Sequence, residues 1–393
     1  MAKSSYFPAI DGLRLLASLN IVFLHLASSS AFTYAKDWVW LKPIVSGPAF
    51  SAGLFFVLAG FLFASKFSDP DRRLPVIPFM FSRIAKLYRL HFFCTLLMFF
   101  AILFKLSGVS SFPVSFQEFT DGLFKGFSEM ENPLRSLFLH LTLLWSFVPE
   151  LGMKLNEPSW ALSGFFICYA VTPAFAKYLF KIKQVRTLWV LLAVSFLPGI
   201  LQGILFGFTD VYSGSYEARF KFYHMFFPMH VAEYFFGMLI FRLYKEGAFC
   251  FLNKNFIAGF CQASGLIALY VSCYLTLYKI QNPALYFIVR HSVPILISGF
   301  FIMTLIPGKG FLARFFCIPI IRTIGRSSFY PYLLHLPLIT IGWSLTKILG
   351  YENFNMDSPF GTFVLILILY TFSPVYLHFK TKRKQAKKNK TVA

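Results

Sequence analysis

Charged residues are scarce in this sequence of 393 residues, at 13% of positions against about 25% in an ordinary globular domain. Hydrophobic residues make up 57% of the chain, and 53 of its residues are phenylalanine. This composition excludes a water-soluble protein and also a disordered, collagen-like or coiled-coil chain. Acidic residues are especially few: 16 Asp and Glu stand against 37 Lys and Arg, which gives a net charge of +21.

Motifs for metal and redox chemistry are missing as well. The six cysteines contain no CxxC pair and nearly all lie in apolar runs, which predicts small buried side chains rather than disulfides or thiolate ligands. No HxxxH pair or carboxylate cluster points to zinc or to a pair of iron ions. A glycine-rich phosphate loop is absent too, so we expect no metal and no tightly bound cofactor.

Long apolar runs are what the sequence has in abundance. A helix needs about 20 mostly apolar residues to cross a hydrocarbon core of ~30 Å. Ten segments meet this requirement: 8–30, 46–65, 88–107, 159–180, 187–206, 226–243, 256–278, 287–306, 328–349 and 361–379. A shorter apolar segment, 135–148, is expected to form an interfacial or re-entrant helix. The predicted fold class is therefore an all-α, polytopic bundle of about ten transmembrane helices.

The basic residues set the orientation of these helices. With ten spans, both termini lie in the cytoplasm and most basic loops lie there too, as the positive-inside rule requires; an eleventh span would export several of them. Seven of the basic residues fall between Lys380 and Lys390. We therefore divide the chain into a membrane domain, 1–379, and a basic cytoplasmic tail, 380–393. Such charge indicates contact with anionic membrane lipids rather than nucleic acid.

The first span carries two polar residues that a membrane helix rarely contains. Arg14 and His25 lie eleven positions apart, which is within about 20° of three full turns, so both share one helix face about 16 Å apart along the axis. Arg14 could simply extend to the headgroups and His25 could be a hydrogen-bonded core histidine. Alternatively, the pair belongs to a site within the bundle.

A basic stripe precedes the third span. Arg83, Lys86 and Arg89 recur every three residues, so they share one helix surface near the cytoplasmic boundary. The stripe is either a topology determinant that contacts lipid or a binding site for phosphates. His335 lies in a late span, near one face with Tyr332 and Ser328, and spacing alone favours core packing for it.

Six segments stand out in chain order: YFPAIDGLRLLASLNIVFLH at the start, LFFVLAGFLF (54–63), SRIAKLYRLHFF (82–93), EPSWALSGFFICY (157–169), FPMHVAEYFFGMLIF (227–241) and IGRSSFYPYLLHLPL (324–338). In order and spacing they resemble the membrane-bound acyltransferase-3 family. The first segment is similar to that family's first helix, in which ten residues separate an Arg from a His. The resemblance covers nearly the whole chain.

The sequence departs from the family pattern at several positions, including Ala59 in place of a serine and Arg89 in place of a common proline, and three other departures concern the site. Phe165 stands where the family has a glutamate, His230 stands where an arginine is frequent, and Gly53 stands where many members have an acidic residue. Glu233 is the remaining carboxylate within a span that could replace the missing one.

The resemblance implies an acyltransferase that moves an acyl group, acetyl first of all, from cytoplasmic acyl-CoA to a carbohydrate or glycolipid hydroxyl in a bacterial inner membrane. For such a transfer we expect His25 to act as the general base or to pass the acyl group on covalently, with Arg14 assisting, because histidine has a pKa near neutrality. The resemblance also favours the stripe of Arg83, Lys86 and Arg89 as the acyl-CoA site. Glu233 and His335 are further catalytic candidates. A secondary transporter, with Arg14, His25 and Glu233 lining its path, is the alternative from a different class.

Overall fold

The computed structural model describes residues 6–27, 42–45, 48–67, 75–109, 115–148, 155–208, 216–225, 227–349 and 359–392. Helices dominate these ranges, and no strand occurs in them. The helices of the first half are α1 (Pro8–Ala27), α2 (Lys42–Val45), α3 (Pro48–Ala64), α4 (Val76–Leu106), α5 (Phe116–Glu129), α6 (Pro133–Leu141), α7 (Trp160–Leu179), α8 (Val185–Val194) and α9 (Leu197–Phe208). Those of the second half are α10 (Tyr216–Met225), α11 (Phe227–Lys245), α12 (Asn255–Tyr278), α13 (Pro283–Leu305), α14 (Phe311–Phe316), α15 (Pro319–Ser327), α16 (Phe329–Ile348) and α17 (Pro359–Val392). Short 3₁₀ turns occur at Trp145–Phe147, Glu157–Ser159 and Cys250–Asn253.

The all-α membrane fold predicted from the sequence is confirmed. Seven segments of the described chain are long and apolar enough to cross a membrane: Pro8–Leu26, Val76–Leu106, Glu157–Leu179, Val185–Gly207, Asn255–Tyr278, Pro283–Leu305 and Phe360–Phe379. The shorter apolar helix Phe50–Ala64, together with α11 and α16, covers the other three predicted spans. The count of ten stays a prediction, and parts of the expected spans at residues 28–30, 46–47 and 226 lie outside the described residues.

The structure describes two further segments for which the sequence makes predictions: the short apolar segment 135–148 and the expected domain boundary at residue 380. The segment 135–148 forms α6, of nine residues, and a 3₁₀ turn at Trp145–Phe147. At 1.5 Å per residue α6 is about 14 Å long, which is too short to cross the hydrocarbon core. The expected boundary at residue 380 falls inside α17, which continues to Val392, although the side chains of Lys380 and of residues 383–392 lie outside the described set.

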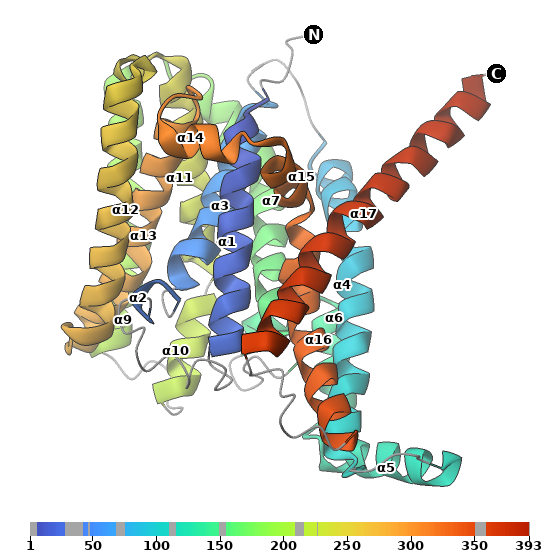
Figure 1. Cartoon of the computed structure of the whole chain (residues 1–393). Coiled ribbons are helices and arrows are strands. Elements are labelled where there is room, and N and C mark those ends of the chain that lie inside the picture. The colour runs from blue at the N-terminus through green and yellow to red at the C-terminus, as the bar shows by residue number, and fades with distance from the viewer. Residues whose placement is uncertain are drawn as a thin grey trace.

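The bundle is built around α3. This helix has no charged residue, and its buried side chains, such as Leu54, Phe56 and Phe61, contact neighbours on several sides. A helix that is apolar all round belongs in the interior, and α3 indeed packs against α1, α7, α11 and α13. By contrast, α12 lies at one edge (Figure 1) and exposes large side chains such as Phe256 and Phe260, as expected of a surface that faces lipid.

Several helices that line the candidate site meet at one end of the bundle. There α1 begins and α17 ends, and the short helices α14 and α15 cover the same end (Figure 1). We call this end the basic face because Lys66, Arg83, Lys86 and Arg326 lie there. At the opposite end, α5 leaves the end of α4 and runs across the direction of the bundle.

The crossing of α3 and α11 is a contact between backbones. A Cβ atom on Gly60 would lie 1.8 Å from the Tyr234 carbonyl oxygen, and one on Gly237 would lie 2.0 Å from the Val57 carbonyl oxygen. No side chain fits there, so glycine at both positions lets the two helices approach closely. This crossing fixes where α11 places His230 and Glu233.

Replacing Gly237 by alanine should therefore separate the central helices. We expect Gly237→Ala to lower the free energy of unfolding by at least about 1–3 kcal/mol, the usual penalty for overpacking a core. Thermal unfolding of the purified protein in lipid nanodiscs measures the effect. Gly259→Ala is the matched control, because a Cβ at Gly259 in α12 would meet its nearest atom, Phe311 Cδ1, at 4.0 Å. Equal stability of the two variants would contradict the packing argument.

Candidate functional site

The first turns of α1 are tied to α15 through Asp11. The Asp11 carboxylate is only 5% exposed, and it accepts hydrogen bonds from Arg14 Nη1 at 3.3 Å and from Arg326 Nε at 3.0 Å. A Cβ atom on Gly325 would lie 1.8 Å from the Asp11 carbonyl oxygen, so only glycine lets α15 approach α1 this closely. The close approach brings Arg326, distant in the sequence, next to Arg14.

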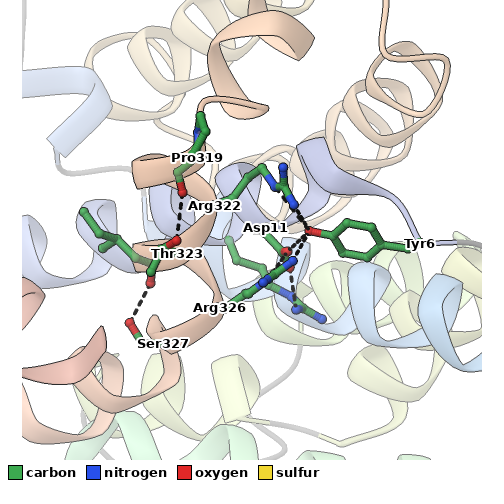
Figure 2. A network of polar contacts seen from close by, with 9 residues as sticks. Tyr6, Asp11, Pro319, Arg322, Thr323, Arg326 and Ser327 are labelled. Atoms are coloured by element: carbon green, nitrogen blue, oxygen red, sulfur yellow. Dashed lines mark hydrogen bonds and ion pairs between the residues drawn. The ribbon is translucent and has the colours of Figure 1, made fainter. Parts of the chain in front are cut away.

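Tyr6 completes this network (Figure 2). Its hydroxyl donates to Asp11 Oδ2 at 2.8 Å and accepts from Arg322 Nη2 at 3.1 Å and from Arg326 Nη2. The hydrogen bonds to Tyr6 and Asp11 raise the pKa of Arg326 above its ordinary value. Arg326 is a permanent cation, as arginines are, and Tyr6 and Asp11 hold it against the start of α1.

A cavity of about 490 Å³ opens beside this network on the basic face. Its lining includes the cations Arg14, Lys66 and Arg326, the anion Asp11 and the ring of Tyr169. Three cations against one carboxylate leave the cavity with an excess of positive charge. Such a lining is suited to an anion with several oxygen atoms, because guanidinium groups donate in a planar fork and the lysine adds a mobile point charge.

Arg83 and Lys66 both contact the ring of Phe63. The Arg83 guanidinium carbon lies 5.0 Å from the centre of the Phe63 ring, and Lys66 Nζ lies 5.5 Å from it, while Phe63 itself lines the cavity. These are cation–π distances. Partial burial, followed by repulsion from Arg83, Lys86 and Arg14, lowers the pKa of the Lys66 ammonium. An anion bound among these groups would relieve that repulsion.

The predicted basic stripe divides between two environments. Arg83 is half-buried next to the cavity, and Lys86 is exposed but close enough to act electrostatically on Lys66. Arg89 is exposed and lies about 9 Å beyond Arg83 along α4, and it is not among the described residues that line the cavity. The structure thus brings Arg14 and Arg83 together with Lys66, and leaves Arg89 apart from them.

Deep in the bundle, two predicted histidines meet. The rings of His25, on α1, and His335, on α16, have their centres 5.0 Å apart. His335 is fully buried, and its Nδ1–H donates to the Pro331 carbonyl oxygen at 3.0 Å. Its Nε2 atom therefore carries a lone pair, and it has no hydrogen-bond partner among the described residues. This atom can accept a proton from a bound molecule.

Glu233 lies in a different pair. Its carboxylate is 2% exposed and contacts His230 Nδ1 at 2.9 Å, while His230 Nε2 donates to the His224 carbonyl oxygen at 2.9 Å. Both ring nitrogens of His230 face acceptor atoms, so the imidazole is held between the Glu233 carboxylate and the backbone of α10. Gly53 lies beside this pair, because a Cβ at that position would lie 3.4 Å from Glu233 Oε1, which is van der Waals contact.

The position of the absent family glutamate is apolar in this chain. Phe165 stacks on Phe56 at 4.5 Å, and Phe56 stacks in turn on His230 at 4.6 Å. Phe165 also stacks on Tyr169, with ring centres 5.8 Å apart, and Tyr169 lines the cationic cavity. Aromatic packing therefore fills the space between the cavity and the His230–Glu233 pair.

Several residues of this site were not singled out from the sequence. Lys66, Arg326 and Tyr6 carry no periodic signal that links them to Arg14, and α15 reaches α1 only through tertiary packing at Gly325. Asp11 had a local signal, because it lies three residues before Arg14 on the same helix.

Comparison with known proteins gives a family match and a relative. A family model described as an acyltransferase domain matches residues 7–378. Acyltransferase MdmB of Streptomyces mycarofaciens is 29% identical over 184 residues, an alignment that covers 46% of this chain and 42% of that protein. The chain thus matches less than half the length of this relative. No solved structure matches the chain.

The His230–Glu233 pair should be a coupled, buried unit. We expect Glu233→Gln and His230→Gln each to lower the free energy of unfolding, because each leaves a buried partner uncompensated. The double variant should be less destabilised than the sum of the two by about 0.5–3 kcal/mol. A double-mutant cycle of unfolding free energies measures this difference, and strictly additive effects would show that the two side chains do not depend on each other.

Proposed function

Because the chain belongs to the acyltransferase-3 family, we propose that this membrane acyltransferase moves an acyl group, acetyl first of all, from acyl-CoA to a hydroxyl group of a carbohydrate. Surface polysaccharides, glycolipids and oligosaccharides are acceptors of this class. The observation that carries the proposal is the arrangement along α1. Arg14 lines a cationic cavity at the start of the helix. His25 lies eleven residues after Arg14, and its ring contacts that of His335.

The cationic cavity is suited to the donor. The phosphates of CoA are anions with many acceptor oxygens, and Arg14, Lys66 and Arg326 supply donors to match them. Arg83 lies beside Phe63 at the edge of the same cavity, and Lys86 adds charge nearby. Within the stripe suggested by the sequence, Arg83 and Lys86 are therefore the better candidates for donor binding. Arg89 is the weaker one.

The histidine pair is suited to the transfer step. The acceptor O–H gives its proton to imidazole nitrogen as its oxygen attacks the thioester carbonyl carbon, and the carbon–sulfur bond breaks. The thiolate of CoA then takes up the proton as it leaves. His25 is the base suggested by the sequence motif, and the available lone pair at His335 Nε2 makes His335 its partner or its equal. Glu233, already paired with His230, acts through packing and charge rather than as the base.

The direction of the protein in the membrane follows from the donor. Acyl-CoA is cytoplasmic, so the basic face is the cytoplasmic face of a bacterial inner membrane, with both termini on that side. Arg14 then lies near the donor, while His25, about 16 Å further along α1, lies deeper in the membrane. The acceptor reaches the histidines from within the bundle or from the far side.

Cleavage of acyl-CoA tests the proposal directly. Purified wild-type protein in nanodiscs should transfer or hydrolyse the label of [¹⁴C]acetyl-CoA. His25→Ala and His335→Ala should each lower this rate by about 10²–10⁴-fold, the usual contribution of general base catalysis, with unchanged thermal stability as evidence of folding. His378→Ala, at an exposed position of α17, is the control. Folded wild-type protein that leaves acetyl-CoA intact but moves a solute across proteoliposomes would establish the transporter instead.

Donor affinity should depend on pH through Lys66. Since the pKa of Lys66 is lowered, its ammonium loses its charge at a lower pH than an ordinary lysine does, and affinity for CoA should fall as pH rises through that pKa. Lys66→Arg should remove this fall, because arginine keeps its charge. Calorimetric titration with CoA at several pH values measures it. Lys105→Arg, in the last turn of α4, is the matched control because it also keeps its charge. A pH profile of Lys66→Arg identical to that of the wild type would contradict the assignment.

A further inference from the structure

The start of α7 holds a second group of unpartnered polar atoms. Asn156 Oδ1, Ser159 Oγ and Ser163 Oγ have no hydrogen-bond partner among the described residues, and all three side chains are 0% exposed. Each buried polar atom without a partner costs free energy, and these three lie within eight residues of one another. Ser159 and Ser163 are four residues apart, which places both hydroxyls on one face of the helix start.

This group is held against the helix that carries His335. Asn156 Nδ2 donates to the Leu333 carbonyl oxygen at 3.0 Å, and Tyr332 Oη donates to the Pro158 carbonyl oxygen at 2.7 Å. These two bonds fix the segment before α7 against α16 at positions two and three residues before His335. They also settle the orientation of the Asn156 amide, because only its NH₂ group can donate to a carbonyl.

The unpartnered atoms have a common hydrogen-bonding character. Asn156 Oδ1 and His335 Nε2 can only accept, and the two serine hydroxyls can both accept and donate. A phosphate or carboxylate offers only acceptors and would leave Asn156 and His335 unsatisfied. A neutral molecule with several hydroxyl groups supplies the donors that these atoms need and acceptors for the serines. The group thus differs in kind from the basic cavity, which offers donors to an anion.

From this arrangement we infer that Asn156, Ser159 and Ser163 form the acceptor subsite, which binds a neutral polyol such as a sugar ring and presents one of its hydroxyls to His335. The inference rests on the proposed acyl transfer and assigns the place and the charge of its acceptor. Ser159, Ser163 and Asn156 are positioning residues, because the proton passes to histidine.

Release of CoA thiol from acetyl-CoA, measured with methyl β-D-glucopyranoside, methyl β-D-galactopyranoside and methyl α-D-mannopyranoside, tests the subsite. At least one neutral glycoside should accelerate thiol release by wild-type protein with saturation. Ser159→Ala and Ser163→Ala should each raise the half-saturating concentration of that glycoside about fivefold, because each removes one hydrogen bond to it. The half-saturating concentration of acetyl-CoA should stay unchanged. Ser298→Ala is the matched control, because that buried serine already donates to the Pro294 carbonyl oxygen.

Three outcomes would overturn the subsite while leaving acyl transfer intact. The first is cleavage of acetyl-CoA that no neutral glycoside accelerates. The second is an unchanged glycoside dependence in both serine variants, which is what purely structural serines would give. The third is a preference for glucose 6-phosphate over the neutral glycosides. Failure of wild-type protein to cleave acetyl-CoA would instead refute the proposed function.

A binding measurement keeps the inference testable without turnover. Stabilisation of the wild-type protein by a neutral glycoside in thermal unfolding supports the subsite, and it should require a higher glycoside concentration in Ser163→Ala. Removing an unsatisfied buried hydroxyl should not itself unfold the protein. If both serine variants unfold nonetheless, the wild-type shift decides: no stabilisation by any of the three glycosides contradicts the subsite.

Discussion

The buried carboxylate of Asp11 is the charge on which the basic face depends. It lies between Arg14 and Arg326 and also accepts from Tyr6, so it holds two cations and the entry to α1 in one network. Asp11 is buried whereas Arg14 and Arg326 are partly exposed, so replacing Asp11 would remove the one carboxylate that both arginines share. Asp11 therefore joins α1 to α15 and, by the same bonds, shapes the wall of the cationic cavity.

A second constraint is that hydrogen-bond donors and hydrogen-bond acceptors gather in different parts of the bundle. The basic face presents mainly donors, on Arg14, Lys66 and Arg326, whereas the interior near His335 presents mainly acceptors. Polar atoms within a membrane bundle have little water to satisfy them, so each group is suited to a ligand of opposite character. The two substrates that we propose, an anionic donor and a neutral acceptor, match this division.

The sequence was sufficient for the class of fold and for part of the site. Apolar runs predicted membrane helices, and α-helical spacing placed Arg14 and His25 on one face. The contact between His25 and His335 could not follow from spacing, because it joins the first and a late helix; only the family resemblance ranked both. The three-residue spacing that included Arg89 described one helix surface correctly, but it could not show how far along α4 the cavity extends.

Other features depended on tertiary packing that no local pattern contains. Arg326 reaches Arg14 because glycine at position 325 admits α1, and Lys66 reaches Arg83 through Phe63. The pairing of Glu233 with His230 could be predicted from their i, i+3 spacing, and it explains why this carboxylate is engaged away from the His25–His335 contact.

The most direct test of the account is an electron cryomicroscopy structure with a non-cleavable thioether analogue of acetyl-CoA. It should show phosphates among Arg14, Lys66 and Arg326 and the acetyl group toward His25 and His335. Binding of the analogue at the opposite end of the bundle would contradict the account.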